Sequence, residues 1–309
     1  MRTFPGCVLL VAIFALLFSL TGCGAGNASF TQPPPPTNTL AYLHRSSAGN
    51  NYTIYDLKVL HGDGSVATLL SSQSLISAVL SPNGQKILYS YYDPNVVDYQ
   101  IATMNADGSA NTVLTGNGSF GLYPQYTPDG SKIVYEASGI FTRSIAVMNA
   151  DGTSPLIINA AFGNQYCFPS TNGSIIAASV IIGASQGLAT MNMDGSNQQV
   201  IVNSAYFSYS TFNGNQIVFS TSDGHNYNLY TVNPDGTNLT QITNSLVNWD
   251  PLALGGSIYF VSVPSSVQNP NTDSQQIFSM KPVGSNPTAV TNDTLYDGFK
   301  TANGFCLNP

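Results

Sequence analysis

The chain has 309 residues, with 8 basic and 15 acidic side chains, a net charge of −7 and only 7% charged residues. We expect no nucleic-acid partner, because phosphates are bound by a basic patch and the sequence contains none. With so few ions, the surface must be hydrated by uncharged hydrogen-bonding side chains such as Ser, Thr and Asn.

The N-terminal segment 1–22 has the features of an export signal. Arg2 is followed by an apolar run to Leu20, which is shorter than a membrane-spanning helix requires. The segment "LTGC", which ends at Cys23, resembles the lipobox of bacterial lipoproteins. That resemblance implies cleavage before Cys23 and its acylation and, because Gly24 follows, an outer-membrane location facing the periplasm or the cell surface. The alternative is an ordinary secretory signal in which the cysteine is incidental.

A tether of residues 23–38 is predicted after the signal. From Gly24 it reads "GAGNASFTQPPPPTN", without apolar periodicity; Gly and Ser make it flexible, and the proline run then stiffens it. We therefore expect one folded domain over residues 39–309, attached to the membrane only through the lipid.

Two glycine-containing turns recur along this domain. The stretch "IATMNADGS" at 101 returns as "IAVMNADGT" at 145. The first series is Asp63-Gly64, Asp107-Gly108, Asp151-Gly152, Asp194-Gly195 and Asp235-Gly236, with Val283-Gly284 as a degenerate sixth. The second series is Asn83-Gly84, Asp129-Gly130, Asn172-Gly173, Asn213-Gly214, Gly255-Gly256 and Asn303-Gly304. Two interleaved turns with one period indicate a repeat architecture.

The stretches between the turns have β-strand patterns. Segments such as "KILYSYY" at 86 and "QIVFSTS" at 216 alternate apolar and polar residues between turns, which predicts hairpins. Four antiparallel strands per repeat predict the blade of a β-propeller, so the fold class is all-β. The first repeat begins at "TLAYLHR", its second strand, and the chain ends with "DTLYDGFKTANG", an inner strand without a complete blade. We expect this last strand to join the first blade and close a six-bladed ring.

The repeat resembles that of the TolB-type propellers. "YTPDGSKIVYEA" from Tyr126 to Ala137 and "IAVMNADGTS" from Ile145 to Ser154 carry the resemblance, which covers residues 38–304. It implies a six-bladed propeller. Only the short tether is expected before the first blade, where TolB has an α/β domain, and the hydrolase domain of the related prolyl oligopeptidases is missing as well.

Few residues indicate catalysis. The three histidines fall in different parts of the repeats, so they are not expected to converge on a metal or a substrate. They are His44, His61 and His225. Glu136 is the sole glutamate. A glycosidase needs two facing carboxylates, and Asp250 and Asp297 are the pair that falls in adjacent inner strands, where both can instead brace loops. We expect no cofactor and no metal.

Three further groups have structural explanations. The Asn-x-Asp-Gly turns carry one carboxylate each, too few for calcium, and Asx-turn chemistry accounts for them. Cys167 and Cys306 are expected in opposite blades, which favours two free, partly buried thiols over a disulfide. The methionines at the ends of the third strands are expected to pack between blades. They are Met104, Met148, Met191 and Met280.

Aromatic residues gather in the loops that lead into the inner strands, which should open on one face around the channel mouth. With small polar neighbours they can form a binding surface, or they can fill the space between blades. Trp249, the only tryptophan, is the favoured contact, and Lys300 is the expected cation near the channel. The candidate ligand-binding residues are Tyr123, Tyr166, Tyr206, Trp249, Asp250, Tyr296, Asp297 and Lys300.

These features favour a non-enzymatic function. The leading hypothesis is a monomeric, lipid-anchored propeller that binds an envelope protein or a glycan at the channel mouth. The alternative is a polysaccharide hydrolase or lyase that uses Asp250 and Asp297. A permanent scaffold within a larger envelope assembly is a third interpretation.

Overall fold

The computed structural model describes most of residues 39–298. The described ranges are 39–48, 52–72, 74–116, 120–139, 142–158, 166–182, 185–204, 206–222, 227–244, 248–262, 275–281, 287–291 and 297–298. The chain divides into two units, Met1–Thr31 and Gln32–Pro309, and all described residues belong to the second. The predicted signal and tether, including Cys23, lie outside the described residues.

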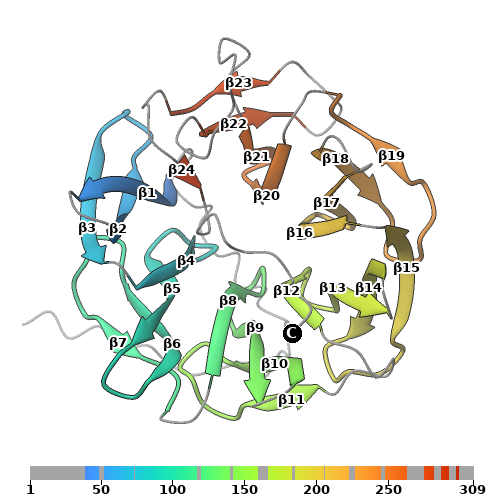
Figure 1. The fold of residues 1–309 in the computed structure, drawn as a ribbon, viewed down its shortest axis with the longest axis horizontal. Coiled ribbons are helices and arrows are strands. Elements are labelled where there is room, and N and C mark those ends of the chain that lie inside the picture. Colours follow the sequence, from blue (N-terminus) through green and yellow to red (C-terminus); the bar gives the residue numbers. More distant parts are fainter. Residues whose placement is uncertain are drawn as a thin grey trace, which may run out of the picture. The chain divides into compact units, whose positions relative to one another are not determined.

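Six antiparallel sheets of four strands form a ring, and the described residues contain no helix (Figure 1). Blade 1 contains β24 (Asp297–Gly298), β1 (Leu40–Ala48), β2 (Tyr52–Leu60) and β3 (Val66–Ser72). Blade 2 contains β4 (Leu75–Leu80), β5 (Lys86–Asp93), β6 (Asp98–Asn105) and β7 (Thr112–Val113). Blade 3 contains β8 (Phe120–Tyr126), β9 (Lys132–Gly139), β10 (Thr142–Asn149) and β11 (Leu156–Ile158).

The second half of the ring repeats this order. Blade 4 contains β12 (Tyr166–Thr171), β13 (Ile175–Ile182), β14 (Ser185–Asn192) and β15 (Gln199–Ser204). Blade 5 contains β16 (Tyr206–Asn213), β17 (Gln216–Ser222), β18 (Tyr227–Val232) and β19 (Thr240–Gln241). Blade 6 contains β20 (Asn248–Leu254), β21 (Ser257–Ser262), β22 (Gln276–Met280) and β23 (Thr288–Ala289).

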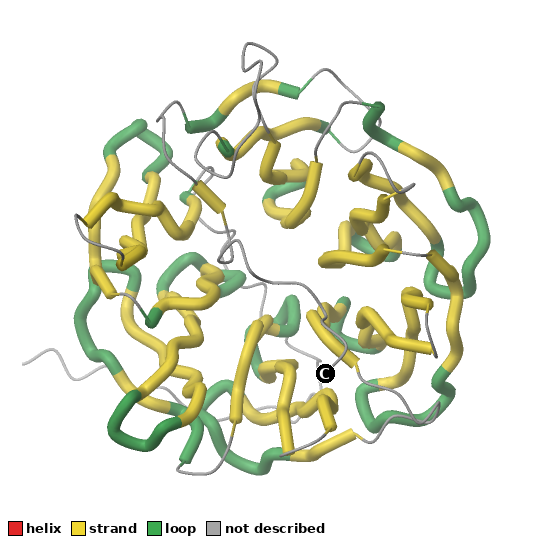
Figure 2. The backbone as a smooth tube through the Cα atoms, in the orientation of Figure 1, coloured by secondary structure: helices red, strands yellow, loops and turns green. Residues whose placement is uncertain are grey.

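The ring closes as predicted. β24, from the C-terminal part of the chain, pairs antiparallel with β1, with His44 opposite Asp297 and Leu43 opposite Gly298. In each blade the first strand of the sheet lies nearest the centre and the fourth lies at the rim (Figure 2). The structure therefore confirms an all-β, six-bladed propeller whose last strand completes the first blade.

The Asp-Gly turns link the third and fourth strands, and in blades 2 to 5 their glycines lie close to the preceding blade. In blade 3, Asp151 Oδ1 accepts hydrogen bonds from the backbone N (3.0 Å) and Oγ1 (2.6 Å) of Thr153, which lower the pKa of the carboxyl. Gly152 has φ 86°, and a Cβ there would lie 2.7 Å from the carbonyl oxygen of Leu114 in blade 2. Glycine is thus needed for both conformation and space. The same Asx turn forms at Asp63, Asp107, Asp194 and Asp235.

The hydrophobic core lies between adjacent blades. Met104 of blade 2 packs with Leu57 and Val59 of blade 1, and Met148 of blade 3 packs with Leu88 of blade 2. All four predicted methionines are buried, which confirms their packing role. Adjacent blades therefore stabilise one another through apolar contacts.

Candidate binding site at the propeller mouth

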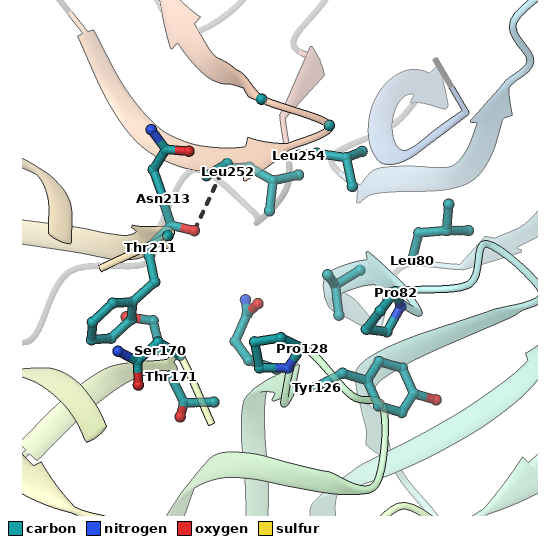
Figure 3. Close-up of a pocket in the computed structure, with 18 of the residues that line it drawn as sticks. Leu80, Pro82, Tyr126, Pro128, Ser170, Thr171, Thr211, Asn213, Leu252 and Leu254 are labelled. Atoms are coloured by element: carbon teal, nitrogen blue, oxygen red, sulfur yellow. Dashed lines mark hydrogen bonds between the residues drawn. The ribbon is translucent and has the colours of Figure 1, made fainter. Parts of the chain in front are cut away.

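A cavity opens where the inner strands end (Figure 3). Its volume is about 540 Å³, and it is lined by the last residues of β4, β8, β12, β16 and β20, by the turns after them and by the start of β1. Because the blades repeat one strand order, their inner strands run in the same sense and end on the same face. We name this site the end cavity.

The two sides of the end cavity differ chemically. Aliphatic and proline side chains from blades 1, 2, 3 and 6 form one side, and hydroxyl and amide side chains from blades 4 and 5 form the other (Figure 3). Tyr126 of blade 3 and Phe212 of blade 5 add aromatic rings to the lining. The apolar side contains Leu40, Leu80, Pro82, Pro128, Leu252 and Leu254. The polar side contains Ser170, Thr171, Asn172, Thr211, Asn213 and Asn215.

The described lining of the end cavity is uncharged and contains unused amide groups. None of the described residues that line it carries a charge. Within the described part of the chain, the side-chain amides of Gln125, Asn213 and Asn215 make no hydrogen bond. Asn172 uses only its Oδ1, which accepts from two backbone N–H groups at 3.0 and 2.9 Å, so its NH₂ group is also available. These amides can bond a ligand without disrupting the fold.

The hydroxyl groups of the polar side, by contrast, hold the wall together. Thr211 Oγ1 accepts a hydrogen bond from the backbone N of Ala253 in blade 6, at 3.3 Å (Figure 3). The hydroxyls of Ser170 and Ser210, from blades 4 and 5, lie 3.0 Å apart. These bonds join neighbouring blades at the end cavity, so its wall is a preformed surface.

Three aromatic rings fill the centre of the propeller, deeper along the inner strands. The ring centroids of Tyr123 and Phe168 lie 4.7 Å apart, those of Phe168 and Tyr209 4.1 Å apart and those of Tyr123 and Tyr209 6.0 Å apart. All three side chains are buried. Tyr123 and Phe168 sit in β-bulges with φ 49° and 52°, where the register of their strands shifts. A bulge re-aims a side chain, and here it brings rings from blades 3, 4 and 5 together.

A polar cluster lies beside these rings. Asp250 occupies the equivalent bulge of β20, with φ 49° and 4% exposure. Arg143 Nη1 donates a hydrogen bond to Glu136 Oε1 at 2.9 Å. Burial raises the pKa of Tyr123 most, and Glu136 and Asp250 raise it further against the opposing effects of Arg143 and a hydrogen bond with Tyr209. Two predicted site residues, Tyr123 and Asp250, are thus brought together inside the propeller.

Asp250 is separated from the end cavity. The space between them is a void of about 10 Å³, lined by Gln125 and Leu252 from the cavity wall and by Asp250 itself. Such a void holds no more than one water molecule. Asp250 is therefore not part of the described lining of the end cavity.

The aromatic face predicted from the loops lies at the opposite end of the inner strands, where they begin. Trp249 is half-buried there, and its ring meets Tyr227 edge-on with 5.9 Å between centroids. Tyr166, Tyr206 and Asp297 have their backbones in β12, β16 and β24. Their side chains, and the whole of Tyr296 and Lys300, lie outside the described residues. Ligand binding by these residues stays a prediction.

The other reactive residues do not form a site within the described ranges. His44 lies in a second strand, β1, and His61 precedes the Asp63 turn, as predicted, while His225 lies outside the described residues. In those ranges no group of three or more His, Cys, Asp or Glu could hold a metal ion. They also contain no helix that could span a membrane. Cys167 lies in β12, but its side chain and Cys306 lie outside the described residues, so their thiol state stays a prediction.

The end cavity was not predicted, although the repeats contain a signal for it. In blades 2 to 6 the second residue of the second strand is isoleucine, while its partner in the last two residues of the inner strand varies. These variable partners are Leu80, Tyr126, Thr171, Phe212 and Ala253, and all five line the cavity. The isoleucine is constant because it packs in the core. Its variable partner indicates a surface position at which the residue is not fixed by the fold and can serve binding.

No protein-family model matches the chain, and no curated protein matches its sequence. Solved structures are similar to it in fold. TolB from Acinetobacter baumannii is 16% identical with a TM-score of 0.68, over 86% of this chain and 66% of that one, so the chain spans just under two thirds of that TolB. A structure titled as a nidogen/laminin complex is 12% identical with a TM-score of 0.61, over 84% and 94% of the two chains.

Enzymes occur among the similar structures as well. An oligogalacturonate lyase in complex with manganese is 12% identical with a TM-score of 0.50, over 84% of this chain and 74% of the lyase. Likeness at such identities concerns the fold and not the activity. The comparisons confirm the predicted resemblance: the propeller of this chain has the fold of the TolB-type propellers.

Proposed function

We propose that this chain is a non-enzymatic binding module of the cell envelope, which takes a protein segment or a glycan in the end cavity, on the face opposite the predicted aromatic face. The observation that carries the proposal is the end cavity. Its lining offers unused amide groups but no carboxylate, imidazole, thiol or amine among the described residues. Tyr126 is the titratable side chain of the described lining, and burial raises its pKa further above neutrality, which makes it a poor general acid–base catalyst; this lining is therefore suited to binding.

The envelope location rests on the N-terminal sequence. The lipobox-like "LTGC" supports an acylated Cys23, and the tether of residues 23–38 would then connect the lipid to the propeller. A similar structure is a TolB protein, which is consistent with an envelope protein, although the likeness extends to fold alone. An outer-membrane lipoprotein that presents its propeller to the periplasm or the cell surface is the form of the protein that we propose.

Site-specific photo-crosslinking in intact cells tests the proposal. A photo-reactive amino acid at Asn215, an exposed residue of the cavity wall, should capture the ligand. The same amino acid at Gln216, exposed and next in sequence but not part of the lining, is the matched control. A third chain combines the probe at Asn215 with Asn213→Trp, which fills the cavity. Capture at 215 that is absent at 216 and lost with Asn213→Trp supports the proposal; equal capture at both positions, or none, contradicts it.

A hydrolase or lyase is the second candidate, and the buried carboxylate of Asp250 at the centre of the propeller favours it. Positive φ at a non-glycine residue such as Asp250 often accompanies a functional site. Since Asp250 is not part of the described lining of the end cavity, the chemistry would have to occur from the face where the inner strands begin. Turnover of a polysaccharide that is abolished by Asp250→Asn would establish this candidate in place of the first.

A further inference from the structure

We propose that the end cavity binds a neutral saccharide of mono- to disaccharide size. This inference deepens the proposed function and rests on it. Three properties of the cavity carry it: the absence of charge from its described lining, its division into an apolar and a polar side, and its set of unused amides.

The uncharged lining determines the charge of the ligand. A charged group that enters a cavity loses hydration, and without an opposite charge nothing compensates for this loss. The described lining residues provide neither a cation for a uronic acid, sulfate or phosphate nor an anion for an amine. The ligand that fits is therefore neutral.

The two sides of the cavity match the two kinds of surface on a sugar ring. A pyranose presents C–H groups on its faces and hydroxyl groups around its edge. Leu80, Leu252 and Leu254 can cover one C–H face of the sugar. The aromatic rings of Tyr126 and Phe212 can also stack on the C–H faces. Hydroxyl groups both donate and accept hydrogen bonds, as side-chain amides do.

The unused amides come from three consecutive blades and form one arc of the cavity wall. Gln125 belongs to blade 3, Asn172 follows the inner strand of blade 4, and Asn213 and Asn215 belong to blade 5. Donors and acceptors along this arc of the cavity fit the hydroxyl groups along one edge of a sugar ring. They give the ligand a defined orientation as well as affinity.

A peptide fits this geometry less well. Extended peptides are bound along one strand edge, through a continuous row of backbone groups. At this mouth only the last residues of each inner strand reach the cavity, so the surface is a circle of five short strand ends. The volume of about 540 Å³ lies within the range of small-molecule sites, roughly 300–1,000 Å³.

Calorimetric titration of the purified full chain tests the inference. The probes are cellobiose, maltose and N,N′-diacetylchitobiose, with digalacturonate as an anionic control. We expect at least one neutral disaccharide to bind and digalacturonate to bind at least about tenfold more weakly, because its carboxylates find no cation. Absence of binding by all three neutral disaccharides, or preference for digalacturonate, overturns the inference.

Two isosteric variants locate the site. Asn213→Asp removes the amide donor and places a charge in the cavity, so affinity should fall by about tenfold. Gln216→Glu makes the same change in charge outside the lining and should leave affinity unchanged. Asn215→Asp, in an exposed turn, gives a second cavity variant in case Asn213→Asp perturbs folding. Equal affinities of the cavity variants and Gln216→Glu overturn the assignment.

The outcomes distinguish this inference from the proposed function. A polypeptide captured by the probe at Asn215, together with no saccharide binding, overturns the saccharide inference and leaves the binding module intact. Neither capture nor saccharide binding overturns both. Saccharide binding that the Asn213→Asp variant weakens supports both.

Discussion

Arg143 Nη1 lies 2.9 Å from Oε1 of Glu136, the sole glutamate of the chain, whose side chain is completely buried. In blades 2, 4 and 5 the equivalent position of the second strand is serine. These residues are Ser90, Ser179 and Ser220, and all three are buried. Blade 3 therefore contains an ion pair where its neighbours contain a hydroxyl group. A buried carboxylate is much more costly than a hydroxyl when its partner is removed.

Arg143→Ala should therefore destabilise the protein more than Glu136→Ser. The first variant leaves a buried carboxylate without its guanidinium and should lower the free energy of unfolding by about 3 kcal/mol. The second installs the residue that blades 2, 4 and 5 already use. Urea unfolding measures both, and the double variant should resemble Glu136→Ser. An Arg143→Ala variant as stable as the wild type would mean that other groups hold the carboxylate.

Gly152→Ala should cost more stability than Gly64→Ala, although the two turns share one motif and have φ 86° and 85°. Positive φ penalises alanine by about 1 kcal/mol in both turns. At Gly152 the new Cβ would also meet the carbonyl oxygen of Leu114 at 2.7 Å, whereas at Gly64 nothing lies within 4 Å. We expect an additional loss of about 1–3 kcal/mol at Gly152, measured by urea unfolding. Equal losses would show that blades 2 and 3 can move apart to make room for the new Cβ without a cost in stability.

These turns also show what the sequence can and cannot predict. The Asp-Gly series and its period are local features that predict the repeated blades, and the incomplete first and last repeats were sufficient to predict six blades and ring closure. The contact between Gly152 and Leu114 joins two blades and depends on their packing distance. The side chains at the centre of the propeller were harder still to predict from the sequence. The bulges at Tyr123 and Asp250 shift the strand register and turn these side chains inward. A one-residue shift exchanges the two faces of a strand, which alternation alone does not reveal.

The stability of the folded chain should fall above pH 10 in part through Tyr123. The pKa of this phenol is raised in the folded state from its ordinary value of 10.0, chiefly by burial. Its contribution is therefore fully present below about pH 10 and is lost as the pH rises further, because the unfolded chain ionises first. Tyr123→Phe removes this dependence, so thermal unfolding of the variant should change less between pH 9 and 11. A pH profile parallel to that of the wild type would contradict the assignment.

Cys23→Ser should release the protein from membranes. If Cys23 is acylated, several acyl chains hold the protein on the bilayer, and each buried methylene contributes about 0.8 kcal/mol. Fractionation of cells should find the wild type with the membranes and the variant in the soluble fraction or as an uncleaved precursor. Cys167→Ser is the control and should leave the distribution unchanged. A Cys23→Ser variant processed normally and still bound to membranes would exclude the lipid anchor.

Trp249→Ala should remove a partner that binds at the face where the inner strands begin, without affecting the end cavity. Trp249 is half-buried against Tyr227, so it presents part of its ring to solvent in a fixed orientation. Crosslinking in intact cells should capture this partner with the wild type but not with Trp249→Ala. Trp249→Phe keeps an aromatic ring against Tyr227 and should restore part of the capture.

Saccharide titration of the same variants should give wild-type affinity, because the end cavity lies at the other end of the inner strands. Unchanged capture by Trp249→Ala would assign its ring to packing alone.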